Sequence, residues 1–456
     1  MAHSAHLACR DYRRLHFSRR ALLRAGTAGV AGLSLPRLLK AEAQGEIRNA
    51  RAKSVIMLFQ FGGPSHFETF DPKPLAPAEI RGEFAAIATR NPELKICEHL
   101  PRLATLADKF ALIRSVHHDR ASHNPGAYYS LTGRKPLNPD VTANAAATDF
   151  PSPGAVLDFF RRDKHEVPTA VSLPTMIADG PFRTPGEFAG FLGKLHDPLF
   201  ITQDPNSASF SVEQLSLPGG VTVERLKRRR EMLAGLLGSS PLAGTSAAVR
   251  GMDAYQSRAF DLLTSPATER ALKITDEDAA TRDRYGRNTY GQSVLMARRL
   301  VESGVRFVTV YYSPGIGGWD THKDNFKTLK ATRLPHTDMA VSSLLEDLDR
   351  RGLLDETLVI WTGDFGRTPK INKDAGRDHW PPCQTVMLAG GGIRGGALIG
   401  ASDKTGAYPL SDPHAPDAVM ATVYQALGLD PATIIRDQLG RPMPIADAEP
   451  IRALLG

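Results

Sequence analysis

The chain has 456 residues, 42% of them hydrophobic and 23% charged, and a formal net charge of +7. This length and composition suit a globular protein with one large α/β domain and some insertions. Residues 1–43 hold eight basic and two acidic groups, so the remainder is close to neutral, at about +1. The charge therefore gives no indication of nucleic-acid or membrane-surface binding.

The first 43 residues have the pattern of an export signal. Arg19 and Arg20 precede the short apolar stretch Ala25–Leu35, and Ala41–Ala43 fits a small-x-small cleavage site. A basic amphipathic arm is the alternative. We expect twin-arginine export, a mature chain beginning near Gln44, and a periplasmic or extracellular location. No other run reaches the ~18 apolar residues of a membrane span, so no integral membrane segment is expected in the mature chain.

Strands and helices alternate along the rest of the chain. The apolar runs that predict strands are 54–61, 111–116, 169–173, 305–312, 357–363 and 385–389. Helical periodicity or capping predicts helices within 100–107, 128–131, 223–237, 251–264, 282–303, 337–351 and 416–427. Residues 174–222 are rich in Pro, Gly and Ser and predict an irregular excursion. We expect one α/β domain over 44–456, with a parallel-rich central sheet and helices on both faces.

Polar residues cluster directly after four of the predicted strands. These clusters are Ser65, His66, Glu68, Thr69, Asp71 and Lys73; His117, His118, Asp119 and His123; Trp319, Asp320 and His322; and Asp364, Arg367, Arg377, Asp378 and His379. Ligands bind at the carboxyl ends of parallel strands, where all four would meet. Each cluster alone can be explained by packing or local hydrogen bonds, but four together favour a site. Histidine with carboxylate suits zinc, manganese or non-haem iron, whereas more carboxylate and water suits magnesium or calcium.

Two cysteines, Cys97 and Cys383, remain after the expected signal. In an oxidising compartment they can form a disulfide, or each can be a free thiol. Their separation in the sequence does not decide between the two.

Two segments resemble sulfatases and other enzymes of the alkaline-phosphatase superfamily. GLLDETLVIWTGDFG, ending at Gly366, is similar to the GLLDNTLVIFTSDHG segment whose Asp-His pair binds metal, but here the pair is Asp364–Phe365. Residues 123–134 resemble Cys/Ser-x-Pro-x-Arg-x-x-x-x-Thr-Gly-Arg, with His123 at the nucleophile position and Ala127 at the internal arginine. The resemblance implies an alkaline-phosphatase-like fold and an altered site.

The resemblance also implies roles for individual residues. The expected metal ligands are Asp320, His322, Asp364 and His379, and the expected anion-binding residues are Arg134, Arg367 and Arg377. His123 is the candidate nucleophile or general acid/base, and Ser65 with His66 is the second choice. The usual first metal-binding Asp is missing from the strand-one end, so an intact two-metal site is not expected.

A closer similarity covers nearly all of the mature chain. The motifs GGPSHFETFDPKP, HNPGAYYSLTGRKP, YGQSVLMARRLVESGVRFV, WDTH, FGRTPKIN, GRDHWP and AGGGIRGGALIGASD resemble the bacterial family called domain of unknown function 1501. The similarity implies an exported protein with the alkaline-phosphatase-like fold, and it leaves the reaction open.

Two functions follow as expectations. The first is a hydrolase or transferase of phosphate or sulfate esters, acting on a small molecule or a polysaccharide, with at most one divalent ion (zinc, manganese, magnesium or calcium). The second is a non-catalytic binding protein on a degenerate sulfatase-like scaffold, because fold alone does not imply function. Bound metal distinguishes them. Protein partners and oligomeric state stay open, and no nucleic-acid partner is expected.

Export should depend on the arginine pair. Changing both Arg19 and Arg20 to Lys should leave the uncleaved precursor inside the cell, because the pair precedes the apolar stretch of the signal. Cell fractionation with detection of precursor and mature chain measures this. Normal export of the double variant would contradict the assignment.

Overall fold

The computed structural model describes residues 50–140, 142–161, 167–212, 221–238, 257, 260–261, 263–315 and 317–456. The expected signal at 1–43, most of the expected helix at 251–264 and residues 213–220 of the expected excursion lie outside these ranges. Residues Glu46–Gly456 form a compact unit by themselves.

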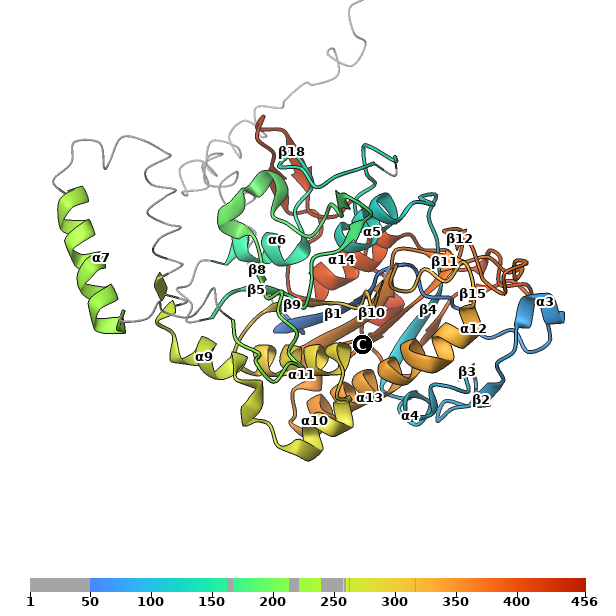
Figure 1. Ribbon diagram of the computed structural model, residues 1–456. Helices are drawn as coiled ribbons and strands as arrows, with labels where there is room; N and C mark the ends of the chain where they lie inside the picture. The colour runs from blue at the N-terminus through green and yellow to red at the C-terminus, as the bar shows by residue number, and fades with distance from the viewer. Residues whose placement is uncertain are drawn as a thin grey trace, which may run out of the picture. The chain divides into compact units, whose positions relative to one another are not determined.

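The centre of this unit is an eight-stranded sheet in the order β14-β4-β13-β10-β1-β9-β5-β8 (Figure 1). The strands are β1 (Ser54–Gln60), β4 (Phe110–Val116), β5 (Ala170–Leu173), β8 (Leu199–Phe200), β9 (Phe307–Tyr311), β10 (Thr357–Gly363), β13 (Gln384–Ala389) and β14 (Leu398–Ile399). Neighbouring strands pair in parallel, except that β13 is antiparallel to both β10 and β4. The expected parallel-rich α/β sheet is confirmed.

The middle strands are buried on both faces, which explains their nearly continuous apolar sequences. All seven residues of β1 and all seven of β10 are buried. Their register pairs Ser54 with Thr357 and Gln60 with Gly363, so both strands end at the same level. On its other side β1 pairs with β9, from Val55–Phe307 to Phe59–Tyr311. The chain therefore leaves three adjacent parallel strands at one edge of the sheet.

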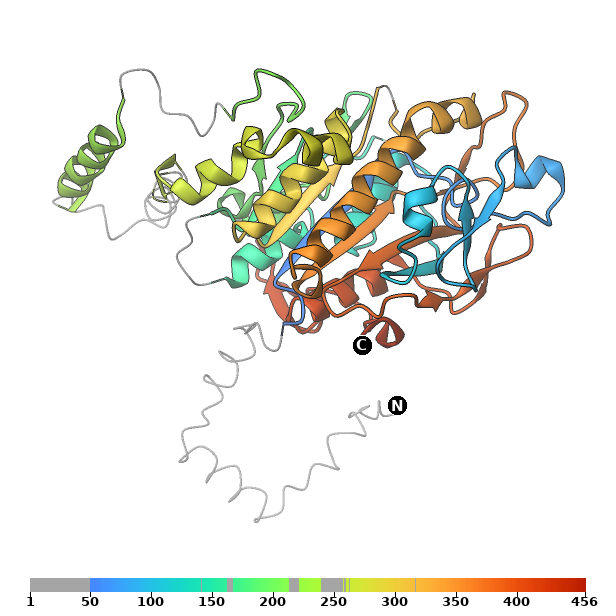
Figure 2. The same cartoon turned by 90° about the horizontal axis from the view of Figure 1, so that it is seen from below.

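Helices cover both faces of the sheet and enclose two hydrophobic cores. On one face lie α4 (Pro101–Ala104), α10 (Ala279–Tyr285), α11 (Thr289–Glu302) and α13 (Leu334–Arg350). On the other face lie α5 (His123–Thr132), α6 (Pro153–Phe160) and α14 (Pro416–Ala426). Figure 2 shows α11 and α13 side by side across the near face. Helices on both faces were expected from the sequence.

Further elements lie outside the central sheet and the helices on its faces. The other helices within the described residues are α3 (Ala78–Arg81), α7 (Val223–Gly238), α9 (Pro266–Leu272) and α12 (Asn325–Thr328), which continues through the π-helical turn Leu329–Arg333 into α13. Two-stranded ribbons are β2 (Ala86–Ala88) with β3 (Lys95–Cys97), β6 (Ala178–Asp179) with β7 (Phe182–Arg183), β11 (Gly366–Arg367) with β12 (His379–Trp380), β15 (Ala401–Ser402) with β16 (Pro409–Ser411), and β17 (Ile434–Arg436) with β18 (Pro442–Pro444). Single 3-10 turns are Gly190–Leu192, Lys194–His196, Ile274–Asp276, Leu354–Glu356 and Arg452–Leu454.

The long helix expected over 282–303 is two helices, and this expectation was wrong. Helix α10 ends at Tyr285, Gly286 has a φ of 97°, and α11 starts anew at Thr289. The Asn288 side chain caps α11 by accepting a hydrogen bond from the Gly291 amide at 2.9 Å. A β-carbon at Gly291 would overlap the Tyr285 carbonyl, so the turn requires glycine there. The apolar periodicity of the sequence continues across this turn, so it does not indicate that one helix ends and another begins there.

The excursion at 174–222 contributes more order than expected. Within its described part, β8 pairs in parallel with β5 and forms the edge of the sheet. A strand of two residues is too short for a periodic signal, so β8 could not be predicted from the sequence. Cys97 and Cys383 are both buried free thiols. Across the described residues, no helix combines the length and apolarity needed to cross a membrane.

The cap at Asn288 should contribute measurably to stability. Replacing it with Ala removes the acceptor for the Gly291 amide and should lower the free energy of unfolding by about 1 kcal/mol. Urea denaturation measures the loss. Glu346→Ala, at an exposed position of α13, is the control and should change stability by about 0.5 kcal/mol or less. Equal stabilities for the two variants would contradict the capping role.

Candidate functional site

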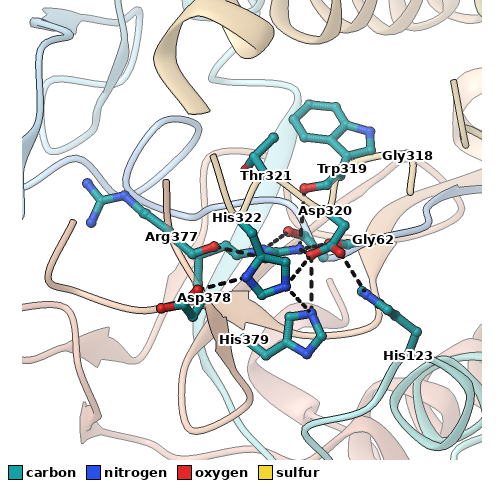
Figure 3. Close-up of polar contacts among 12 residues, drawn as sticks. Gly62, His123, Gly318, Trp319, Asp320, Thr321, His322, Arg377, Asp378 and His379 are labelled. Atoms are coloured by element: carbon teal, nitrogen blue, oxygen red, sulfur yellow. Dashed lines mark hydrogen bonds and ion pairs between the residues drawn. The ribbon is translucent and has the colours of Figure 1, made fainter. Parts of the chain in front are cut away.

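Side chains converge where β1, β9 and β10 end. Asp364 follows β10 directly, Asp320 lies in the loop after β9, and the turn at Gly62 and Gly63 follows β1. His123 begins α5, which packs over the same end of the sheet (Figures 1 and 3). The four segments that meet here are distant from one another in the sequence.

Asp364 is fully buried and acts as an anchor. Its carboxylate accepts hydrogen bonds from the Gly62 amide at 3.0 Å, the Gly63 amide at 2.9 Å and His123 Nδ1 at 2.5 Å. A β-carbon at Gly62, whose φ is 100°, would overlap the backbone of Gly317, so glycine permits this turn. Asp364 therefore ties the end of β10 to the end of β1 and to α5. Its oxygens face these donors rather than open space.

His123 is held on both sides of its imidazole ring. The ring lies between Phe61 and Phe365, with centroids 5.4 and 5.1 Å away, and Nε2 lies 3.4 Å from Asp320 Oδ2. Burial alone would lower the pKa of His123, but hydrogen bonds and charge from Asp320 and Asp364 outweigh it and raise the pKa to about 9.

Asp320 is the centre of the cluster. Its Oδ1 lies 2.6 Å from Arg367 Nη2 and 3.1 Å from Nε2 of both His379 and His322. Burial would raise the pKa of this carboxyl, but the histidines and Arg367 outweigh that effect and hold it well below its usual range. Asp320 is therefore ionised at neutral pH.

Three imidazoles present Nε2 to the same carboxylate, and each is fixed from behind through Nδ1. His123 Nδ1 contacts Asp364, His322 Nδ1 lies 2.7 Å from Asp378 Oδ1, and His379 Nδ1 lies 2.6 Å from the Ala121 carbonyl. Carboxylate and carbonyl oxygens only accept, so each Nδ1 carries the proton. When a ring is neutral, its inward Nε2 therefore offers a lone pair, and the Nε2 atoms of His322 and His379 are only 3.1 Å apart (Figure 3).

This donor set fits a divalent cation. Ligand atoms of His123, Asp320 and His379 all lie within 4.8 Å of one another, and His322 Nε2 joins the Asp320–His379 pair at 3.1 Å. Two lone pairs facing each other beside a carboxylate repel, and a cation between them removes the repulsion. Metal-binding histidines typically donate their other ring nitrogen to a carboxylate or carbonyl, as all three do here. Nitrogen with one oxygen suits zinc or another transition metal.

The three arginines expected to bind anions all have protein acceptors. Arg367 is fully buried and donates to the carbonyls of Gly62, Gly63 and Arg377 and to Asp320. Arg377 pairs with Glu68, and its side chain points away from the cluster in Figure 3. Arg134 contacts Asp447 and the Pro444 carbonyl and lies over the Phe150 ring. Anion binding by these residues remains a prediction that the geometry does not favour.

Ser65 and His66, the second choice for catalysis, are buried outside the contacts of the cluster. His66 Nε2 lies 2.9 Å from the Gly406 carbonyl, and its ring packs against Phe67 at 4.1 Å. Burial lowers the pKa of His66 to about 4, so the ring is neutral. These contacts describe a neutral histidine that braces the turn after β1.

Two residues of the site were given no role of their own in the sequence analysis. His118 Nε2 lies 2.7 Å from the Asp364 carbonyl, and burial lowers the pKa of this histidine to about 4. Asn372 donates to the His322 carbonyl at 2.9 Å and to Asp378 Oδ1 at 3.2 Å. In the sequence, His118 is one member of the polar cluster after the second predicted strand, and an asparagine in a polar loop gives no distinguishing signal.

A mostly parallel α/β sheet with a histidine–aspartate cluster at its strand ends defines the class of this protein. The family model described as "Protein of unknown function (DUF1501)" matches residues 52–455. The chain belongs to this family. No protein of curated function matches it significantly.

Similar solved structures belong to the alkaline phosphatase and sulfatase superfamily. A sulfatase from Pseudoalteromonas sp. is 14% identical with a TM-score of 0.35, and the match covers 86% of this chain and 70% of that one. An alkaline phosphatase from the Antarctic bacterium TAB5 is 13% identical with a TM-score of 0.38, covering 84% and 99%. A phosphonate monoester hydrolase from Silicibacter pomeroyi is 12% identical with a TM-score of 0.33, covering 89% and 76%. At such scores these similarities carry no argument about chemistry or substrate.

The raised pKa of His123 predicts a pH-dependent stability in metal-free protein. Its folded-state pKa of about 9 exceeds the ordinary value of 6.5, so the stabilisation is complete below pH 6.5 and is lost as the pH rises through 9. A shift of this size corresponds to about 3 kcal/mol. Urea denaturation in chelator at pH 6 and pH 9.5 should show this loss in the wild type.

The matched variant is His123→Gln, which keeps a polar side chain of similar size but cannot titrate. Its stability should fall with pH by about 3 kcal/mol less than that of the wild type over the same interval. Parallel pH profiles for the two proteins would contradict the interaction of protonated His123 with Asp320 and Asp364.

Proposed function

We propose that this protein is an exported, metal-dependent hydrolase or transferase of phosphate or sulfate esters, working with one divalent ion. The observation that supports this most is the convergence of Nε2 of His322 and His379 with Asp320 Oδ1, at 3.1 Å in every pair. The two histidines and Asp320 would hold the ion. His322 and Asp320 are partly exposed, which suits a site that must admit a substrate.

The ion would supply Lewis-acid activation of an ester oxygen or of water. Asp320 keeps its negative charge at neutral pH and so lowers the cost of bringing a cation there. Arg367 donates to Oδ1 of this carboxylate, the oxygen that His322 and His379 also approach, and so fixes its position from the buried side. His379 is oriented by the Ala121 carbonyl. The chain therefore presents a prearranged set of ligand atoms.

His123 is the proposed proton carrier or nucleophile. Its Nδ1 is bound to the buried carboxylate of Asp364, an arrangement that orients an imidazole and stabilises its protonated form. Nε2 then faces the cluster beside Asp320. His123 is also the first residue of α5, whose N-cap Ser122 makes no side-chain cap hydrogen bond. Free amides and the helix dipole at this end favour a negatively charged group.

Phe365 supports one ion rather than two. It occupies the position where the superfamily segment has a metal-binding histidine, and its ring packs 5.1 Å from His123 and 4.5 Å from His379. An apolar ring there offers no ligand atom and fills space beside Asp364. Asp364 is moreover occupied by two amides and His123, so it serves here as the partner that orients His123.

The second candidate is a binding protein without catalysis. The observation that favours it is the state of Arg134, Arg367 and Arg377, whose guanidinium groups contact protein acceptors instead of facing the cluster. In that case the histidine–aspartate cluster would bind an ion or an anion, and no turnover would occur. The two candidates make different predictions for purified protein.

Purified mature protein should contain about one equivalent of a transition metal, and His379→Ala and Asp320→Asn should each lose it. His123→Ala should keep the metal and lose turnover of nitrophenyl phosphate or sulfate by about 100-fold or more. Elemental analysis and an ester panel measure these quantities. His99→Ala, at a partly buried histidine packed on Phe84, is the control and should resemble the wild type.

Each result separates the candidates. Bound metal without turnover of any ester would support the binding protein. Loss of metal in His123→Ala would make His123 a ligand in place of a proton carrier, which the proximity of His123, Asp320 and His379 also permits. A wild-type protein that binds no metal at all would overturn the proposed function.

A further inference from the structure

We propose that Asn372 and Asp378 form a latch that holds His322 in place as a metal ligand, so that the 372–378 loop controls how tightly the ion binds. This inference rests on the proposed function. It concerns positioning residues that act on the ion only through His322.

His322 needs such a device because it is the most exposed histidine of the cluster. Its side chain is 45% exposed, compared with 9% for His123 and 22% for His379. Phe61 and Phe365 hold the ring of His123, whereas the ring of His322 packs only on His379 among the aromatic contacts of the described residues. An exposed side chain populates several rotamers unless hydrogen bonds select one.

Asp378 provides the selecting hydrogen bond. Its Oδ1 lies 2.7 Å from His322 Nδ1, and the Nε2 on the other side of the ring then points at Asp320 and His379 (Figure 3). The backbone of Asp378 is held in turn by Thr368, because the Asp378 amide donates a hydrogen bond to Thr368 Oγ1 at 3.0 Å.

Asn372 joins the two partners. Its Nδ2 donates both to the His322 carbonyl at 2.9 Å and to Asp378 Oδ1 at 3.2 Å. Its Oδ1 accepts from the amides of Asp374 and Gly376, at 3.0 and 2.9 Å. The side-chain amide of Asn372 thus holds the backbone of His322, the carboxylate of Asp378 and the backbone of the 374–376 turn.

The backbones of the two loops are matched closely to each other. The amides of Asp324 and Asn325 donate to the carbonyls of Asp374 and Ala375, both at 3.0 Å. A β-carbon at Gly376 would overlap the His322 carbonyl, so only glycine allows this approach. Asp324 and Ala375 adopt left-handed conformations, with φ of 49° and 53°. Non-glycine residues take this conformation at a cost that surrounding contacts must offset, and such sites are concentrated where function fixes the backbone.

The test is metal affinity, measured by competition with a chromogenic chelator for zinc, in wild type and variants. Asp378→Asn should weaken zinc binding by about 10- to 100-fold, the usual effect of losing a partner behind a ligand. Asn372→Ala should weaken it in the same direction. Asp374→Asn removes the same charge from the same loop, where Asp374 contributes backbone contacts, and should bind zinc like the wild type.

A double variant tests whether Asp378 acts through His322. His322→Ala should itself weaken binding, and adding Asp378→Asn to His322→Ala should then cause less than a twofold further loss, because the latch has nothing left to hold. Melting temperatures of all variants confirm that they are folded, since Asp378 is 53% exposed and its change should be tolerated.

The outcomes separate this inference from the proposed function. Zinc binding by the wild type together with unchanged affinity in Asp378→Asn would overturn the latch alone. A further 10-fold loss on adding Asp378→Asn to His322→Ala would also overturn it, because Asp378 would then act directly or through general charge. Absence of zinc binding in the wild type would overturn the latch as a control of zinc affinity, and absence of any bound metal would overturn both proposals.

Discussion

The buried carboxylate of Asp364 is the interaction on which the site depends. It is fully enclosed, and its charge is compensated by the amides of Gly62 and Gly63 and by His123 Nδ1. A buried charge is tolerated only when such donors satisfy it. The same contacts join the ends of two neighbouring parallel strands to the start of α5. One carboxylate therefore determines both the local fold and the direction of His123.

The negative charge of Asp320 is compensated by Arg367, which is itself held by the turn that binds Asp364. Arg367 spans the two, because it donates to the carbonyls of Gly62 and Gly63 on one side and to Asp320 on the other. In the Gly62–Gly63 turn, the backbone amides therefore donate to Asp364, and the backbone carbonyls accept from Arg367. Negative charge at Asp320 is then available to the imidazoles that surround it. This explains why an arginine expected to bind substrate is better described as part of the scaffold.

Much of the fold followed from the sequence, and the site followed only in part. Strands such as β1 and β10 were predictable because burial on both faces leaves a continuous apolar run. The break between α10 and α11 was not, since it depends on close approach at Gly291 and on a cap. Asp320, His322 and His379 were expected together from their positions after strands. The place of Asp364 behind His123, and the use of Asn372, depend on loop conformations that no periodicity encodes.

The cluster has two halves with different physical character. His123 and Asp364 belong to the interior, where aromatic rings and a helix hold them, and their geometry is set by the folding of the sheet. His322 and Asp378 belong to the surface, where hydrogen bonds between two loops hold them. Asp320 and His379 connect the halves. A site of this kind can keep the buried His123–Asp364 pair fixed while the exposed His322 responds to changes in the loop that contacts it. In the proposed ion site, substitution of Asn372 or Asp378 would then change ion affinity without disturbing the buried pair.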